Sequence, residues 1–286
     1  MKKLIKKIIK KLIGNIYFFI ELIYESSFFS DYLIIKPLGD LNTYINLSKI
    51  AEKNTYSFEK VSEFEKKMGY SIDKKWIKEL ALYTQVVIKK SPLNYAHGRV
   101  LYSALSNYLN KNLKQIKSVN IIETGTARGF SALCMAKALN DMQQEGKIST
   151  IDILPHDKKI FWNTVTDHYL GKITRAHLLE NWNDLIERYI IFIKGRTKEM
   201  LRKFTLQRVH FAFLDANHTF EDIMFEFNNI SKFQKSGDII VFDDYNAIDY
   251  PGVFKAVNLI ESNLGYILLK ITNANTSRGY VIASKK

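Results

Sequence analysis

The chain has 286 residues, enough for one large α/β domain with a smaller appendage. It carries 42 Lys and Arg against 29 Asp and Glu, a formal charge of +13, and one cysteine, Cys134. A single cysteine excludes an intramolecular disulfide framework and indicates a reducing compartment, so we expect a cytoplasmic protein. Cys134 lies among apolar residues of a predicted helix, which favours a packed thiol over a nucleophile.

Residues 1–24 are predicted to form a basic amphipathic helix. Six lysines fall within the first eleven residues, and the Leu and Ile residues between them keep one helical face apolar. Such a helix suits an anionic membrane surface, so we expect possible peripheral binding at the inner membrane face. Packing on the rest of the protein or on a second subunit is the alternative. Secretion is a third reading, but no small-x-small cleavage site follows, and Asn15 and Glu21 interrupt the stretch too early for a membrane span.

Residues 25–115 are predicted to be a mostly helical N-terminal region or lid. Apolar residues recur at helical spacing over 73–89 and again over 99–109, with a proline between the two segments. His97 and Arg99 are candidates for a lid over the substrate, although a helix-capping or surface role is the simpler expectation.

Residues 116–286 alternate short apolar strands with helices. This alternation predicts an α/β fold, a mostly parallel sheet with helices on both faces. Two closing apolar runs around a short Asn/Ser loop predict a terminal antiparallel hairpin, which brings the sheet to seven strands. Thr219 and Asp222 predict a capped helix start. The predicted strands are 119–123, 148–153, 189–193, 209–215, 238–242, 266–271 and 279–283, with helices over 219–233 and after Pro251.

The first of these strands runs into a loop with two glycines, in the sequence Glu-Thr-Gly-Thr-Ala-Arg-Gly-Phe-Ser over residues 123–131. Glycine allows a tight turn and close approach of a ligand to the backbone. The helix that follows turns its free N–H groups toward that ligand. The spacing is neither Walker A nor Gly-x-Gly-x-x-Gly. Glu123 lies where it could bind hydroxyl groups or a cation.

The other strands end in polar residues at the same edge, where ligands of open α/β sheets collect. Asp152 ends the second strand and suits ribose hydroxyls, and residues 194–197 after the third could border an adenine. Asp215 follows the fourth strand, and Asp243 and Asp244 follow the fifth. These three carboxylates could hold a hard divalent cation. A strand-terminal Asp is also a common helix cap, and Asp244 could instead turn outward into solvent.

Four motifs in chain order resemble those of the metal-dependent class I S-adenosylmethionine (SAM) O-methyltransferases that include macrocin O-methyltransferase and cephalosporin hydroxylase-like proteins. They are Glu-Thr-Gly-Thr-Ala-Arg-Gly-Phe-Ser, Asp-Ala-Asn-His-Thr-Phe-Glu-Asp, Gly-Asp-Ile-Ile-Val-Phe-Asp-Asp-Tyr and Pro-Gly-Val-x-x-Ala-Val, and the resemblance covers about residues 95–283. It implies a Rossmann-like methyltransferase sheet and Mg²⁺ held by Asp215, Asp243 and Asp244. The cofactor contacts it implies are Glu123, Thr124, Gly125, Thr126, Gly129, Phe130, Ser131, Asp152, Ile153, Gly195 and Thr197.

A hydroxyl group is a poor nucleophile at neutral pH, and contact with Mg²⁺ lowers its pKa. A second group must then take the proton. Relatives carry an acid where this chain has Asn217, which cannot act as a base. His218, with Asp215 beside it, is therefore the candidate catalytic pair. The alternative for His218 is a helix-start residue bonded to backbone.

Together these features predict a SAM- and Mg²⁺-dependent O-methyltransferase acting on a hydroxyl of a small molecule, a sugar or a lipid-linked glycan. A non-catalytic SAM-binding or membrane-peripheral interaction protein stays open because of Asn217. A nucleic-acid methyltransferase is motivated by the positive charge, but Asp/Asn-Pro-Pro-Tyr/Phe is missing after the fourth strand, so no nucleic-acid partner is expected. No iron triad supports hydroxylase activity. A homodimer is expected from the resemblance alone.

Overall fold

The computed structural model describes residues 34–112, 115–203, 208–272 and 278–286, so the predicted helix of residues 1–24 lies outside the described part. No helix within these ranges is both long and apolar enough to cross a bilayer. The helices are α2 (Leu41–Tyr56), α3 (Glu59–Met68), α4 (Lys74–Thr84), α5 (Ala96–Asn112), α6 (Phe130–Asp141), α7 (Thr166–Leu170), α8 (Arg175–Leu178), α9 (Asn183–Tyr189), α10 (Thr197–Lys203), α11 (Phe220–Ser231) and α12 (Pro251–Asn263), with a 3₁₀ turn at Glu180–Trp182.

Seven strands form one sheet in the order β3-β2-β1-β4-β5-β7-β6. β1 to β5 are parallel, and β7 runs antiparallel to both β5 and β6. The predicted α/β class and terminal hairpin are confirmed. The order reverses between β1 and β4, the position at which open α/β sheets bind their ligands. The strands are β1 (Ser118–Thr124), β2 (Glu145–Asp152), β3 (Ile190–Lys194), β4 (Phe211–Leu214), β5 (Ile239–Phe242), β6 (Tyr266–Thr272) and β7 (Gly279–Lys285).

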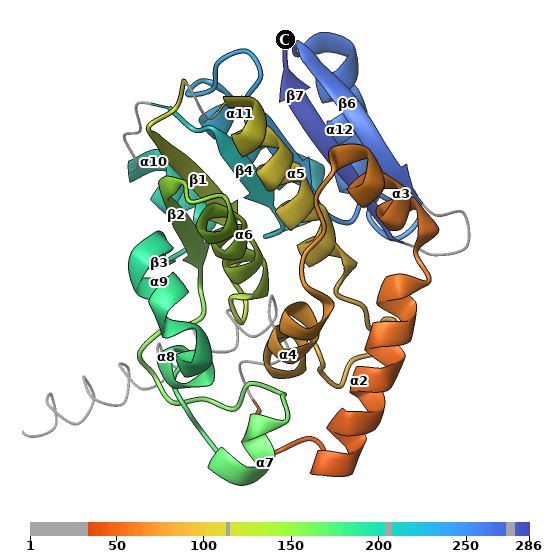
Figure 1. Cartoon of the computed structure of the whole chain (residues 1–286), viewed down its shortest axis with the longest axis vertical. Helices are drawn as coiled ribbons and strands as arrows, with labels where there is room; N and C mark the ends of the chain where they lie inside the picture. The colour runs from red at the N-terminus through yellow and green to blue at the C-terminus, as the bar shows by residue number, and fades with distance from the viewer. Residues whose placement is uncertain (1–33, 113–114, 204–207, 273–277) are drawn as a thin grey trace, which may run out of the picture.

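Alternate side chains of the central strands enter two separate cores, as the period of a strand requires. In β4, Phe211 and Phe213 pack with the layer of helices α2 to α6, whereas Ala212 and Leu214 pack with α11 and α12. Figure 1 shows α5 and α6 lying across one face of the sheet. The N-terminal helices therefore share a core with the sheet.

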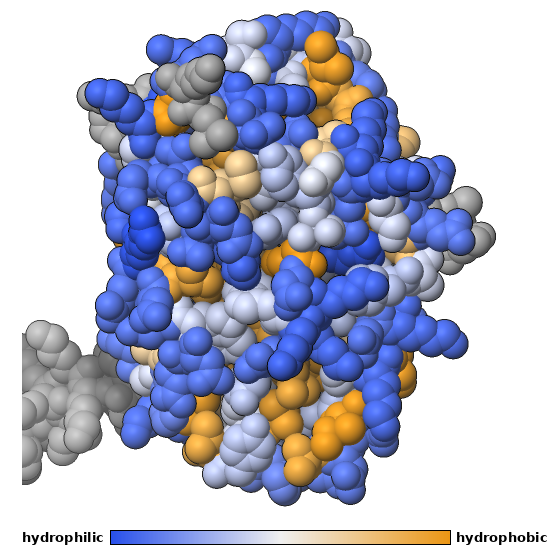
Figure 2. Space-filling model, viewed as in Figure 1, coloured by the Kyte–Doolittle hydropathy of each residue, from blue (hydrophilic) through white to orange (hydrophobic). Residues whose placement is uncertain are grey.

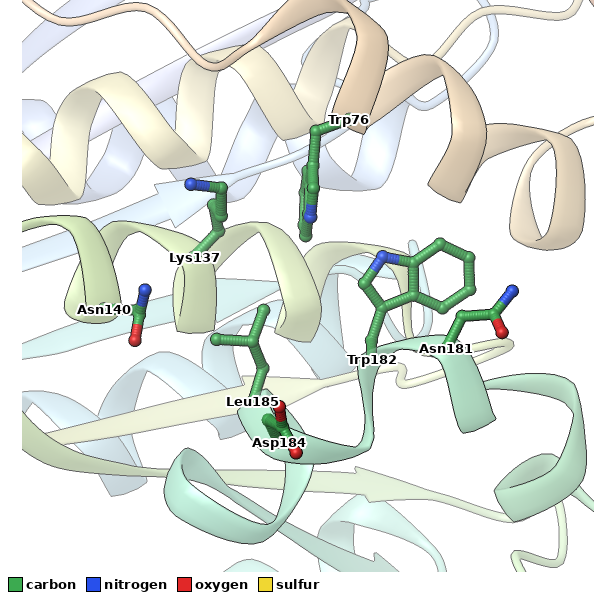
Figure 3. Close-up of a pocket in the computed structure, with 7 residues that line it drawn as sticks. All are labelled: Trp76, Lys137, Asn140, Asn181, Trp182, Asp184 and Leu185. Carbon is green, nitrogen blue, oxygen red and sulfur yellow. The ribbon is translucent and has the colours of Figure 1, made fainter.

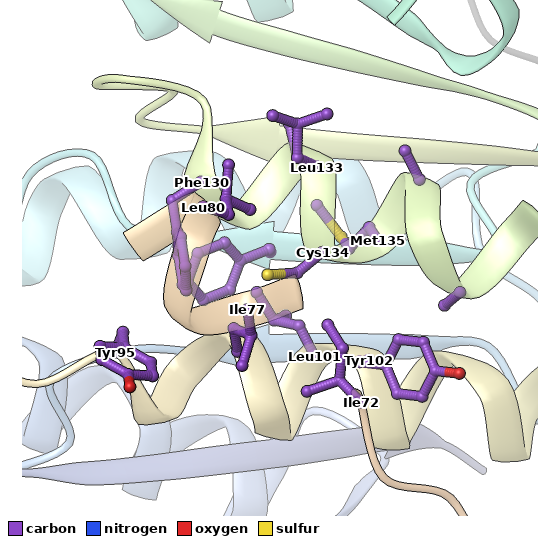
Figure 4. Packing of buried hydrophobic residues seen from close by; sticks show 14 of the residues in the cluster. Ile72, Ile77, Leu80, Tyr95, Leu101, Tyr102, Phe130, Leu133, Cys134 and Met135 are labelled. Atoms are coloured by element: carbon purple, nitrogen blue, oxygen red, sulfur yellow. The ribbon is translucent and has the colours of Figure 1, made fainter. Parts of the chain in front are cut away.

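Helices α4, α5 and α6 pack closely in the first of these cores (Figure 4). A Cβ atom at Gly98 in α5 would lie 2.7 Å from the Sγ of Cys134 in α6, so the small residue sets how near the two helices come. Cys134 is fully buried, and burial raises the pKa of its thiol well above the ordinary value. This is the packed thiol that the sequence predicts.

Two expectations about the helical region are corrected. The helix predicted over 73–89 ends at Thr84, because the chain turns there and buries Val86 and Val87 instead of continuing the helix. His97 and Arg99 are not surface residues, since both side chains are buried.

Long-range packing causes this burial. The ring of His97 lies between Phe130 and Phe213, with ring centroids 4.8 and 6.4 Å away. Arg99 forms an ion pair with Glu65 of α3 and also donates to the carbonyl of Thr55 at 2.9 Å.

Candidate functional site

The loop after β1 has the shape that its glycines predict. Gly125 and Gly129 have φ values of +91° and +93°, and Ala127 between them is also left-handed at +45°. A Cβ atom on Gly125 would lie 2.1 Å from the carbonyl oxygen of Asp215, at the end of β4. Only glycine therefore lets the loop and the end of β4 come this close.

Asp152 fixes this loop to the end of β2. Its two carboxylate oxygens accept the backbone N–H groups of Ala127 at 2.6 Å and Leu154 at 2.7 Å. Burial raises the pKa of Asp152, while the nearby Arg175 and these hydrogen bonds oppose that rise. Asp152 thus has a structural role in addition to the ribose contact predicted for it, which stays a prediction.

Glu123 is fully buried at the end of β1, and its two oxygens differ. Oε2 accepts a hydrogen bond from the hydroxyl of Thr150, whereas Oε1 has no hydrogen-bond partner. Burial raises the pKa of Glu123 to about 7, although the hydroxyls of Ser131 and Thr150 act in the opposite direction. A buried acceptor without a partner is costly, so Oε1 is suited to a donor from a ligand.

Three other predicted cofactor residues have side chains engaged within the protein. The hydroxyl of Thr124 donates to Glu226 at 2.7 Å, and the hydroxyls of Thr126 and Thr150 lie 2.5 Å apart. The ring of Phe130 packs in the helical core. Their backbone groups are therefore better placed than their side chains to donate to a ligand.

The ends of β2 and β3 bring the remaining predicted cofactor residues together. The amide of Gly195 donates to the carbonyl of Asp152 at 2.8 Å, and Thr197 begins α10 directly after it. Ile153 follows the last residue of β2 and is partly exposed. The structure thus gathers Asp152, Ile153 and the turn after β3 at neighbouring positions of one sheet edge.

Arg175 at the start of α8 was missed at the sequence level. Its Nε donates to the carbonyl of Ala127 in the glycine loop at 3.0 Å, and its guanidinium lies over the rings of Trp162 and Phe192. Arg175 is buried and offsets the charge of Asp152. No local pattern signals it, because it lies in a segment whose place over β2 depends on tertiary packing.

Asp215, His218 and Asp244 form a compact cluster at the ends of β4 and β5. One ligand atom from each of them lies within 4.8 Å of the others. Nε2 of His218 lies 3.3 Å from Asp215 Oδ1 and 3.7 Å from Asp244 Oδ2. The side chains of His218 and Asp215 are 27% and 28% exposed, so a ligand can reach them.

Asp243 and Asp244 have different surroundings. Asp244 has a left-handed backbone, with φ of +53°, which turns its side chain into the cluster and not outward into solvent. Asp243 is buried beside it, and its Oδ1 accepts the amide of Asp244 at 2.7 Å. Of the three predicted metal ligands, Asp215 and Asp244 belong to the compact cluster, and Asp243 is a buried neighbour of it.

Two cationic groups balance these carboxylates. Arg278, at the start of β7, lies 2.7 Å from Oδ1 of Asp244, and the surrounding acids raise its pKa despite burial. Burial alone would lower the pKa of His218, but its hydrogen bond with Asp215 and the charges of Asp244 and Asp243 raise it to about 9. Burial and the charge of Asp215 raise the pKa of Asp243 to about 6.

Arg278 and Tyr250 extend the cluster beyond the predicted residues. Tyr250 precedes α12, and its ring meets that of His218 edge-on, with centroids 4.7 Å apart. Burial and the charge of Asp244 raise the pKa of Tyr250 to about 12, so its hydroxyl stays protonated at neutral pH. Arg278 follows a polar stretch of sequence, and nothing in that stretch indicates that the arginine pairs with Asp244.

A pocket of about 300 Å³ lies elsewhere, in the helical layer (Figure 3). None of the predicted site residues lines it. Its residues come from α4, α6, α9 and the 3₁₀ turn, and are Trp76, Lys137, Asn140, Asn181, Trp182, Asp184 and Leu185.

Residues 122–245 match the family model described as "Methyltransferase domain", which spans less than half of the chain. No curated protein matches the sequence. The matched segment contains the glycine loop, the ends of β1 to β5 and the acidic cluster.

Solved structures share the fold at low identity. An O-methyltransferase from Bacillus cereus in complex with SAH is 16% identical, with 75% of this chain and 92% of that chain covered and a TM-score of 0.52. TomG, an O-methyltransferase from Streptomyces achromogenes involved in tomaymycin synthesis and solved with SAM, is 18% identical, with 76% and 92% covered and a TM-score of 0.50. The SAH-bound methyltransferase PaMTH1 from Podospora anserina is 14% identical, with 81% and 96% covered and a TM-score of 0.52. The predicted class I methyltransferase fold is confirmed.

The pairing of His218 with Asp215 predicts a specific pH dependence of stability. Its folded pKa of about 9 lies above the ordinary value of 6.5, so the imidazolium stabilises the fold fully below pH 6.5. That contribution is lost as the pH rises through 9. With a chelator present, His218→Gln should therefore lower the melting temperature at pH 6, and the gap to the wild type should close by about pH 9.5.

Scanning fluorimetry across this range checks the prediction, with His177→Gln as the control because His177 lies at the surface. A gap that stays constant from pH 6 to 9.5 would contradict the charged pairing.

Proposed function

Taking residues 122–245 as the methyltransferase domain that the family match describes, we propose that the chain transfers a methyl group from SAM to a hydroxyl of a small molecule, a sugar or a lipid-linked glycan, with a divalent cation bound nearby. The contact between the glycine loop and the acidic cluster carries this proposal. The amide of Asp215 donates to the carbonyl of Thr124 at 3.0 Å, and Gly125 packs against the carbonyl of Asp215. SAM in the loop would then lie next to Asp215 and His218, and an in-line displacement requires the reacting groups to be held close together.

The residues around the glycine loop fit SAM. SAM carries an ammonium group and ribose hydroxyls, and these groups donate hydrogen bonds. Any of them could supply the hydrogen bond that Oε1 of Glu123 does not receive within the protein. The first turn of α6 after Gly129 presents free backbone N–H groups, which suit a carboxylate. Both O-methyltransferases named above were solved with SAM or its product, which supports the same cofactor here.

The acidic cluster fits a divalent cation. Asp215 and Asp244 would hold it, since their carboxylate oxygens lie in one compact cluster with His218. Arg278 occupies Oδ1 of Asp244 and leaves Oδ2, the oxygen that faces His218. Carboxylate oxygens suit Mg²⁺, and His218 beside them stays available for the proton. When bound, the cation would lower the pKa of an acceptor hydroxyl.

Proton transfer falls to His218 with Asp215. Asn217 is exposed and cannot accept a proton. Asp215 and Asp244 hold His218 as an imidazolium at neutral pH, so it becomes a base only when these negative charges are offset. Asp215 orients the ring through Nε2, and Tyr250 packs against its edge. The side chains of His218 and Asp215 are partly exposed to solvent, so an acceptor hydroxyl can approach them.

Removing the side chain of Glu123 should weaken SAM binding. Glu123→Ala deletes the buried acceptor, and we expect the dissociation constant for SAM to rise roughly tenfold or more, equivalent to about 1.4 kcal/mol. Isothermal titration calorimetry measures it, with Glu145→Ala as the control because Glu145 is an exposed acid on the neighbouring strand. An unchanged affinity in Glu123→Ala would remove it from the cofactor site.

The cation site predicts loss of methyl transfer in a chelator. Asp244→Asn should reduce transfer of labelled methyl from SAM to a metabolite extract by roughly 100-fold or more, because a bound cation contributes several kcal/mol. Asp249→Asn is the matched control, since Asp249 is an exposed acid in the same loop. Full activity in a chelator, or equal effects of both variants, would show that the cluster works without a cation.

A further inference from the structure

Three segments form a cap at the carboxyl edge of the sheet, residues 34–45, 85–91 and 153–175. Asn163 ties them together, since its Oδ1 accepts the hydroxyl of Tyr44 at 3.1 Å and the amide of Ile88 at 3.0 Å. Arg128 of the glycine loop donates to the carbonyl of Trp162 at 2.5 Å. The cap is therefore fixed to the site end of the molecule.

Large apolar side chains are exposed on this cap. Ile35 is 82% exposed and Tyr169 is 54% exposed. The start of α2 and α7 lie side by side, as Figure 1 shows. Figure 2 shows apolar residues gathered at this end of the molecule. We call the following residues the apolar patch: Ile35, Leu38, Leu41, Ile45, Tyr169 and Leu170.

The cap segments also carry exposed lysines. The cap segments expose only two carboxylates, those of Asp40 and Asp157. Apolar side chains rimmed by positive charge are typical of surfaces that enter an anionic lipid interface. The exposed lysines of the cap are Lys36, Lys89, Lys90, Lys158, Lys159 and Lys172.

We propose that the apolar patch docks on an anionic lipid bilayer. The chain that precedes it supports this occupant, because 33 residues lead directly into Ile34 and place six lysines in the first eleven positions, with no acid before Glu21. A protein partner would not require this accumulation of lysine on both the cap and the preceding segment. Every lysine near an anionic surface adds electrostatic attraction, so the two regions reinforce each other.

Docking in this orientation turns the carboxyl edge of the sheet toward the bilayer. Docking itself is independent of the proposed function, whereas delivery of a lipid-linked acceptor to the site rests on it. A lipid-linked hydroxyl would then approach Asp215 and His218 from the membrane side.

Sedimentation of the full chain with vesicles of phosphatidylcholine and phosphatidylglycerol tests the docking. The double variant Ile35→Glu with Leu170→Glu should reduce the bound fraction at least fivefold. The milder Leu41→Ser with Tyr169→Ser should reduce it less. The matched control is Leu264→Glu with Ile267→Glu, which changes two apolar residues outside the patch that are 38% and 63% exposed and should bind as the wild type does.

Binding of the patch variants at the wild-type level would overturn the proposal, as would equal loss in the control pair. Concentration-dependent dimerisation that disappears only in the patch variants, without vesicle binding by the wild type, would assign the patch to a second copy instead. Calorimetry with SAM runs in parallel: a patch variant that binds SAM normally separates failure of docking from failure of the proposed function.

Discussion

The burial of several carboxylates at one edge of the sheet is the constraint on which the rest of the site depends. Glu123, Asp152, Asp215, Asp243 and Asp244 all lie at the ends of adjacent strands, and burial raises the pKa of each. Such crowding is tolerable only where hydrogen bonds or cations offset it. Arg175 balances the acids on the β2 side, and Arg278 with His218 balances those on the β4 and β5 side. A divalent cation would complete this balance.

Backbone contact couples the two halves of the site. Because Gly125 lacks a side chain, the end of β4 can lie directly against the loop that follows β1. The reversal of strand order between β1 and β4, where open α/β sheets bind ligands, lies at the same position. The glycine loop and the acidic cluster are consequently in direct backbone contact at one edge of the sheet.

Local patterns made most of the fold predictable. Apolar strands alternating with helices gave the sheet, and the capping pair Thr219 and Asp222 was confirmed by a hydrogen bond of 3.1 Å. Residues after strands were also predictable, because parallel strands bring their carboxyl ends together. The glycine loop and the acids Asp215 and Asp244 lie where this rule places them.

Features that depend on contacts between distant segments were not predictable. The left-handed backbone of Asp244, which separates its role from that of Asp243, follows from packing at the end of β5. Arg278 lies 34 residues after Asp244 in the chain, and the pairing of β7 with β5 brings the two residues together. His97 was expected in a lid, at a helix cap or at the surface, but it packs on rings from α6 and β4.

The central claim is that the methyl donor and a cation lie side by side at this edge. Paramagnetic relaxation of the S-methyl protons of SAM by bound Mn²⁺ tests it most directly, since the effect falls steeply with distance. We predict strong relaxation in the wild type that disappears in Asp244→Asn while SAM remains bound. Relaxation no greater than that caused by free Mn²⁺ in solution would contradict the account.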